Sequence, residues 1–194
     1  MRLRTSSAQG STLSEMIREQ STDQRIWGVV WFTGRPGAGK STTARAVQDH
    51  LASLGLRVPV LDGDLTRQAI DPTLALSMAP RPNVAALHAR LAHMLAIQEL
   101  LVLVAAVSGY KQLKDIPESI AVPTVEVLLD VTPGEALRRR REQGREISTD
   151  HGPTIDSFDR PSRPTLRRGE DFNPANPAAI ADLTIEVLQH LSAA

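Results

Sequence analysis

A glycine-rich segment between an apolar run and a helical pattern constrains the fold of this chain more than any other feature. The segment GRPGAGKS, residues 34–41, fits the pattern G-x-x-x-x-G-K-[ST] at every fixed position. A β-rich apolar run, GVVWF at 28–32, precedes it, and apolar residues at helical spacing follow over 40–54. Glycines permit backbone angles that turn successive N–H groups inward, and the N-terminus of a helix adds partial positive charge. The sequence therefore predicts a strand, a phosphate-binding loop and a helix in succession.

The residues of this loop suit different parts of a bound nucleotide. Lys40 can reach the β- and γ-phosphates as a point charge, and the Ser41 hydroxyl can bind Mg²⁺. We therefore predict ATP and Mg²⁺ as cofactors. The residues expected to surround the phosphates are Gly34, Arg35, Pro36, Gly37, Ala38, Gly39, Lys40, Ser41 and Thr42. Two alternatives remain open, namely a glycine-rich turn that matches by coincidence and a loop that binds nucleotide without catalysis.

Further strands and helices alternate along the rest of the chain, as a parallel sheet requires. The predicted strands lie at 57–62, 100–107 and 124–131, and the predicted helices lie at 84–100, 133–144 and 177–191. Pro59 favours an edge position for the first of these strands, whereas the run at 100–107 is apolar on both faces and favours a central position. Between 145 and 177 we expect loop with at most a short strand. The predicted fold class is α/β, a three-layer P-loop NTPase fold with a central, mainly parallel β-sheet flanked by helices.

Composition and length narrow the class of protein. The chain has 194 residues, which suits one domain, and we expect a flexible polar arm at 1–24 followed by a single domain at 25–194. Lysine plus arginine equals aspartate plus glutamate at 22 each, so the chain lacks the basic excess typical of nucleic-acid binding. The longest apolar run is far shorter than the roughly 20 residues that a membrane helix needs. The N-terminus has no apolar signal region, and we expect a cytoplasmic protein that binds neither nucleic acid nor membrane.

A second acidic motif follows the strand predicted at 57–62. The segment VLDGDLTR, residues 60–67, places Asp62 and Asp64 at the sheet edge where open α/β sheets bind ligands. One carboxylate can hold Mg²⁺ through water, and the other can accept or orient the proton of a substrate hydroxyl. Arg67 can then bind an anionic substrate. The alternative is an ordinary Asp-Gly turn.

These two motifs together resemble the adenylylsulfate kinases, often called APS kinases. Enzymes of that family phosphorylate the 3′-hydroxyl of adenosine 5′-phosphosulfate with MgATP. The resemblance is carried by VVWFTGRPGAGKSTTARAV and VPVLDGDLTR, and it continues in VSGYKQLK, VEVLLDVTPGEALRRR and TIDSFDRPSRPTL. It spans about residues 26–190, and its first third is the most specific part.

The resemblance implies roles for individual residues. It makes Asp64 the partner of the acceptor hydroxyl and Asp62 a metal ligand together with Ser41, and it places Arg140 at the base of a mobile lid at about 138–160. The implied catalytic residues are Lys40, Asp64 and Arg140. The implied substrate-binding residues are Asp62, Asp64, Arg67, Arg81, Ser108 and Tyr110. The family also implies a homodimer.

The departures from the family pattern concern the acceptor. The phenylalanine that stacks on the substrate adenine corresponds to Leu76, and the family's N-I-R-R block corresponds to VAAL at 84–87. Gly109 replaces a proline, and the lid segment REQGREISTDHGPT contains no aromatic residue. Three hypotheses therefore stay open: a kinase acting on adenylylsulfate, a kinase acting on another small hydroxyl metabolite or nucleoside, and a catalytically inactive nucleotide-binding regulatory protein.

Overall fold

The computed structural model describes residues 26–70, 81–107, 121–144, 158, 160–161 and 163–193, without the side chains of residues 67, 70 and 81–85. The arm predicted at 1–24 lies outside these residues. The helices are α2 (Lys40–Ser53), α3 (Gly63–Ile70), α5 (Arg81–Ala96), α7 (Pro133–Glu142) and α8 (Pro177–Ser192). The strands are β1 (Gly28–Gly34), β2 (Val60–Asp62), β3 (Leu101–Ala105), β4 (Thr124–Leu129) and β5 (Leu166–Arg168).

The five strands form one sheet in the order β2-β3-β1-β4-β5, and every pair of neighbours is parallel. The predicted fold class is thereby confirmed, as are the edge position of the strand beside Pro59 and the central position of the apolar run at 100–107. The edge strand is shorter than predicted, because it begins at Val60 rather than at Arg57. Pro59 has no N–H to donate to the ladder, and only its carbonyl takes part by accepting from the Leu103 amide at 3.0 Å.

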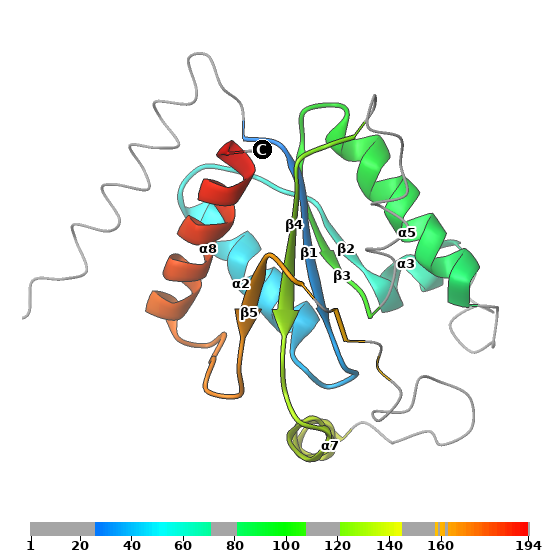
Figure 1. Cartoon of the computed structure of the whole chain (residues 1–194), viewed down its shortest axis with the longest axis vertical. Helices are drawn as coiled ribbons and strands as arrows, with labels where there is room; N and C mark the ends of the chain where they lie inside the picture. Colours follow the sequence, from blue (N-terminus) through cyan, green and yellow to red (C-terminus); the bar gives the residue numbers. More distant parts are fainter. Residues whose placement is uncertain are drawn as a thin grey trace, which may run out of the picture.

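Helices cover both faces of this sheet (Figure 1). On one face, α2 and α8 pack on side chains of β1, β3 and β4, with Phe32 fully buried among them. On the other face, α5 packs on β1 and β3, with Trp31 fully buried. Because successive side chains of a strand point to opposite faces, neighbouring residues of β1 anchor the two halves of the core. Among the described residues, no helix is long and apolar enough to cross a membrane.

The short helix α7 lies apart from these two layers, beyond the carboxyl ends of the strands (Figure 1). It begins where the sequence predicted, because the Thr132 side chain accepts from the Glu135 amide and Pro133 occupies the first helical turn. The helix ends at Glu142, and Gly144 follows with a φ of +63°. The loop predicted at 145–177 contains β5, which pairs with β4. Helix α7 thus faces the sheet edge where the phosphate-binding loop emerges.

Candidate functional site

The phosphate-binding loop, residues 34–41, leaves the sheet at the carboxyl end of β1, its central strand. Strand β1 has β3 on one side and β4 on the other. In open α/β sheets, a ligand binds beyond the carboxyl ends of the strands, where successive connections run in opposite directions. The topology therefore places the loop at the position where this class of sheet binds ligands.

Glycine backbone angles shape the loop. Gly37 and Gly39 have φ angles of +89° and +96°, in the left-handed region that favours glycine. The Ala38 amide donates to the Arg35 carbonyl at 3.0 Å, and the Thr43 amide donates to the Gly39 carbonyl at 2.8 Å as α2 begins. The first turn of α2 contains no acidic residue, so no carboxylate of that turn offsets the partial positive charge of the helix N-terminus. The arrangement suits an anion such as a phosphate group.

Lys40 lies at the centre of this arrangement. Its Nζ donates to the carbonyl of Gly34 at 3.0 Å and to that of Arg35 at 2.8 Å. Burial lowers the pKa of Lys40 to about 8, the carboxylates of Asp64 and then Asp62 raise it, and the Arg140 guanidinium lowers it. The charges of Asp64, Asp62 and Arg140, three of the residues that the sequence assigned to catalysis or metal binding, therefore act on one ammonium group.

Asp62 links the loop to the second acidic motif. It is only 6% exposed, and its Oδ1 accepts from the amides of Asp64 at 3.0 Å and Leu65 at 3.3 Å. Burial raises its pKa, but hydrogen bonds from the Ser41 hydroxyl and from those amides, together with the charge of Arg45, outweigh burial and hold the pKa below its usual value. Ser41 and Asp62, the two residues predicted to bind Mg²⁺, are thus hydrogen-bonded to each other.

The alternative interpretation of this motif as a simple Asp-Gly turn is wrong. Residues from Gly63 onward form α3, and Asp62 accepts from the amides of its first turn in the manner of an N-cap. Asp64 lies in that first turn with its side chain exposed. The helix N-terminus therefore positions Asp64 beside the phosphate-binding loop.

Helix α7 packs directly against the same loop. A Cβ atom added to Gly37 would lie 2.5 Å from the Ala136 carbonyl oxygen and 3.0 Å from Arg140 Cγ. This close approach places Arg140, the predicted lid arginine, over the loop. It also explains why Gly37, which occupies a variable position of the loop pattern, cannot carry a side chain unless the loop or α7 shifts.

Two contacts of the loop were not anticipated from the sequence. Arg35 Nε donates to the Val131 carbonyl at 3.1 Å, and its guanidinium lies 5.7 Å from the centre of the Phe158 ring. Arg139, one residue before the predicted lid arginine, donates to the Ala38 carbonyl. The only signal for Arg139 in the sequence is its position four residues after Glu135, a spacing at which helical side chains meet.

Several of the predicted substrate-binding side chains lie outside the described part of the structure. Arg67 belongs to α3 and Arg81 begins α5, but their side chains lie outside the described part of the structure. Ser108 and Tyr110 lie outside the described residues, as do Leu76, Gly109 and most of the predicted lid segment.

Comparisons with known proteins point to one family. The family model described as Adenylylsulphate kinase matches residues 27–153. The chain is 38% identical over 115 residues to an adenylyl-sulfate kinase of Synechococcus sp. strain JA-3-3Ab, covering 59% of this chain and 65% of that relative. The match therefore spans less than two thirds of that relative's length. Over 170 residues it is 31% identical to an adenylyl-sulfate kinase of Deinococcus deserti, covering 84% of this chain and 90% of that relative.

A solved structure gives a similar result. The Mycobacterium tuberculosis APS kinase CysC, in complex with AMPPNP and APS, superimposes with a TM-score of 0.68 at 28% sequence identity. The superposition covers 86% of this chain and 98% of that one. That relative therefore holds an ATP analogue and adenylylsulfate on the same fold.

Proposed function

This chain belongs to the adenylylsulphate kinase family, and we propose on that basis that it transfers the γ-phosphate of ATP to the 3′-hydroxyl of adenylylsulfate. The observation that supports this most directly is the environment of Lys40. The ammonium group lies within the phosphate-binding loop, and the charges of Asp64, Asp62 and Arg140 all act on it. Lys40, which suits a phosphate donor, and Asp64, which suits a hydroxyl acceptor, therefore lie close enough for their charges to interact.

The donor side of the site is the loop and the N-terminus of α2. Residues 34–42 would bind the phosphate chain through backbone N–H groups, and Lys40 would neutralise charge on the β- and γ-phosphates. Ser41 and Asp62 present a hydroxyl and a carboxylate oxygen in contact with each other, and Mg²⁺ prefers such oxygen ligands. These two residues would hold Mg²⁺, which supplies further neutralisation of phosphate charge when bound.

The acceptor side of the site begins at α3. Asp64 would accept the proton of the acceptor hydroxyl while that oxygen forms its bond to the γ-phosphorus and the bond to the β-phosphate oxygen breaks, releasing ADP. Arg140 would stabilise the negative charge on the transferring group. Arg67, Arg81, Ser108 and Tyr110 would bind the acceptor, as the family resemblance implies.

The segment at about 138–160 would close over the site as a lid. We further propose that the protein is a homodimer and acts in the cytoplasm. The lid and the homodimer are implied by the family resemblance. A kinase of a different hydroxyl compound is less favoured, because the family match includes the acceptor-side motif at 60–67. A nucleotide-binding regulatory protein is less favoured because such a protein needs no carboxylate at Asp64.

The proposed function is tested by ATP turnover with Mg²⁺, with and without adenylylsulfate, and by detection of the 3′-phosphorylated product. We expect product from the natural chain and a loss of about 10²–10⁴-fold in kcat for Asp64→Asn, the range for removal of a general base. Asp49→Asn, which alters an exposed carboxylate of α2, is the matched control. Tight ATP binding without any product from adenylylsulfate would contradict the proposal and lead to a panel of other hydroxyl acceptors.

Nucleotide affinity is expected to fall as the pH rises above 8, because Lys40 loses its proton there. Burial lowers the pKa of this ammonium to about 8 in the free protein, and bound phosphates favour the charged form and raise the pKa again. Binding above this pH therefore takes up a proton, and the dissociation constant should rise by about tenfold per pH unit until the pKa of the bound form is reached. Calorimetric titration in buffers of different ionisation enthalpy measures both the affinity and the proton uptake.

The control for this pH dependence is Lys40→Arg. Arginine keeps its charge throughout this range, so whatever affinity this variant retains should not decline between about pH 8 and 9.5. An affinity of the natural chain that stays constant over the same interval would show that the Lys40 ammonium does not titrate there.

A further inference from the structure

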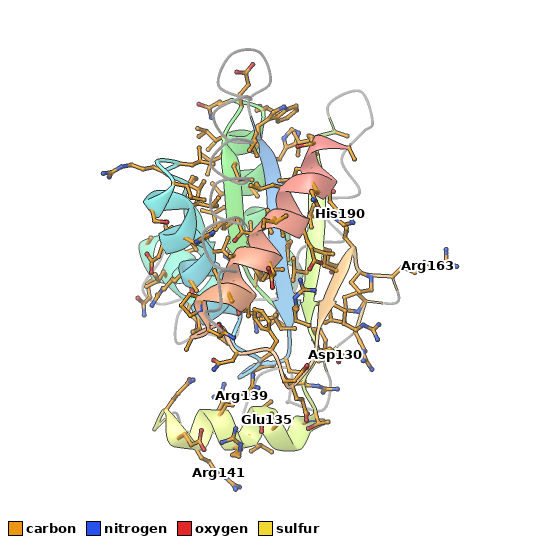
Figure 2. The ribbon with its side chains drawn as sticks, turned by 90° about the vertical axis from the view of Figure 1, so that its left-hand side faces the viewer. Asp130, Glu135, Arg139, Arg141, Arg163 and His190 are labelled. Atoms are coloured by element: carbon orange, nitrogen blue, oxygen red, sulfur yellow. The ribbon has the colours of Figure 1, made fainter. Side chains whose placement is uncertain are left out.

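Arg139 joins three segments that lie far apart in the sequence. Its Nε donates to Glu135 Oε1 at 2.5 Å within α7. Its two terminal nitrogens donate to the Ala38 carbonyl at 3.4 Å, in the phosphate-binding loop, and to the Glu170 carbonyl at 3.2 Å, just after β5. The side chain is 21% exposed. Figure 2 shows Arg139 on the side of α7 that faces the sheet and Arg141 on the opposite side.

The groups that contact Arg139 are themselves held by other hydrogen bonds. Glu135 accepts hydrogen bonds from Arg138 and Arg139, which lower its pKa to about 2, so the carboxylate stays charged. The Glu170 carboxylate accepts from the Thr132 amide at 2.7 Å, which ties the segment after β5 to the start of α7. The guanidinium is therefore held by a charged partner on its own helix and faces two backbone carbonyls on other segments.

The contact with Ala38 has a consequence for the loop. The Ala38 carbonyl and the Gly39 N–H belong to one peptide unit, which is planar and trans, so the two groups point in opposite directions. The structure contains no cis peptide bond among its described residues. A guanidinium that holds the carbonyl on the α7 side therefore directs the Gly39 N–H away from α7. At Gly39 itself, the nearest group to an added Cβ is Arg139 Nη1, at 4.0 Å.

We propose that Arg139 is a positioning residue that sets the orientation of the Ala38–Gly39 peptide and thereby prepares the Gly39 N–H to bind a phosphate of the nucleotide. The proposal rests on the proposed function in so far as the loop binds nucleotide phosphates. It assigns to Arg139 a role separate from that of Arg140, which acts on Lys40. Arg139 need not touch the nucleotide, because it acts through the backbone of the loop.

The test compares Arg139→Gln with Arg138→Gln in the full-length chain. Arg138 is the matched control because it pairs with the same Glu135 carboxylate, at 2.8 Å, but its side chain is 58% exposed. Within the described part of the structure, Arg138 donates only to Glu135 and Glu142 and not to the loop. Calorimetry measures the dissociation constants of ATP and of inorganic tripolyphosphate, and thermal unfolding measures stability. We expect Arg139→Gln to weaken both ligands by about tenfold or more, the effect of losing a charge-assisted hydrogen bond, while Arg138→Gln binds both as the natural chain does.

A second variant separates positioning from general stability. Arg139→Lys keeps a cationic donor and should recover part of the affinity for both ligands, even if its unfolding temperature equals that of Arg139→Gln. Unchanged affinity in Arg139→Gln would overturn the proposal. So would a weakening of ATP without a weakening of tripolyphosphate, because that result would mean that Arg139 contacts the nucleoside. If the natural chain binds both ligands but transfers no phosphate to adenylylsulfate, the proposed function fails while the same variants still decide the role of Arg139.

Discussion

Replacing Lys40 with alanine is expected to lower the turnover number by about a thousandfold, the scale on which removal of one preorganised electrostatic group acts. The variant removes the ammonium group that donates to the Gly34 and Arg35 carbonyls. It also removes the positive charge that Asp64, Asp62 and Arg140 surround. Single-turnover measurements with MgATP and adenylylsulfate separate this effect on the chemical step from any effect on nucleotide binding.

The control for Lys40→Ala is Arg57→Ala, which removes an exposed cationic side chain outside the phosphate-binding loop. Its turnover should match that of the natural chain. Circular dichroism should show that both variants keep their helices, because neither Lys40 nor Arg57 belongs to the two apolar clusters that form the core. Turnover by Lys40→Ala within a few-fold of the natural chain would remove the basis for assigning this loop to phosphoryl transfer.

Replacing Gly37 with alanine is expected to weaken nucleotide binding by about a hundredfold, since displacement of a site by about 1 Å has effects of that size. Gly37 has a φ of +89°, and an added Cβ would lie 2.5 Å from the Ala136 carbonyl oxygen. That oxygen belongs to the backbone of α7 and cannot move as a flexible side chain would. Either the loop or α7 must shift, and both outcomes disturb the position of Arg140 over the loop. Equilibrium titration with ATP measures the loss.

Gly55→Ala provides a matched control for this substitution. Gly55 has a φ of +88°, nearly equal to that of Gly37, but nothing lies within 4 Å of an added Cβ. Both variants carry the strain of a left-handed residue, about 1–2 kcal/mol, and only Gly37→Ala adds the clash with α7. We expect Gly55→Ala to lower the free energy of unfolding by roughly that amount and to bind ATP normally. Equal nucleotide affinity in the two variants would show that the close approach of α7 is unimportant for binding.

The parts of the fold that follow from local patterns were predictable from the sequence. The loop at 34–41, the central apolar strand predicted at 100–107 and the helix beginning at Pro133 each depend on periodicity or on a short motif. Each is found at the predicted place, although the strand is shorter and spans Leu101–Ala105. The sequence predicted a mainly parallel sheet but not the full order of its strands, because the periodicity of apolar residues does not reveal which strands pair. The error at 57–62 arose because the β-rich pattern extends through Pro59, whereas Pro59 has no N–H and contributes only its carbonyl to the ladder, so the strand begins at Val60.

The arrangement of the candidate site was only partly predictable. Asp62 and Asp64 were expected beside the loop because carboxyl ends of parallel strands share one edge. Helix α3 was missed because its first turn reads as an Asp-Gly turn, and only the hydrogen bonds to Asp62 reveal the cap. The contacts of Arg139 depend on how Ala38 and Glu170 are brought together in space, and no spacing in the sequence encodes that meeting.

The order of the strands also governs how the chain acquires its phosphate-binding loop during folding. In the described part of the structure, β1 pairs with β3 from Gly28 and Leu101 onward, and with β4 from Val29 and Thr124 onward. Both neighbours of the strand that carries the loop are therefore synthesised long after it. Such distant pairings make loop closure costly before any contact forms, which slows folding. On the ribosome, the segment that binds the nucleotide therefore emerges before either of the strands that support it.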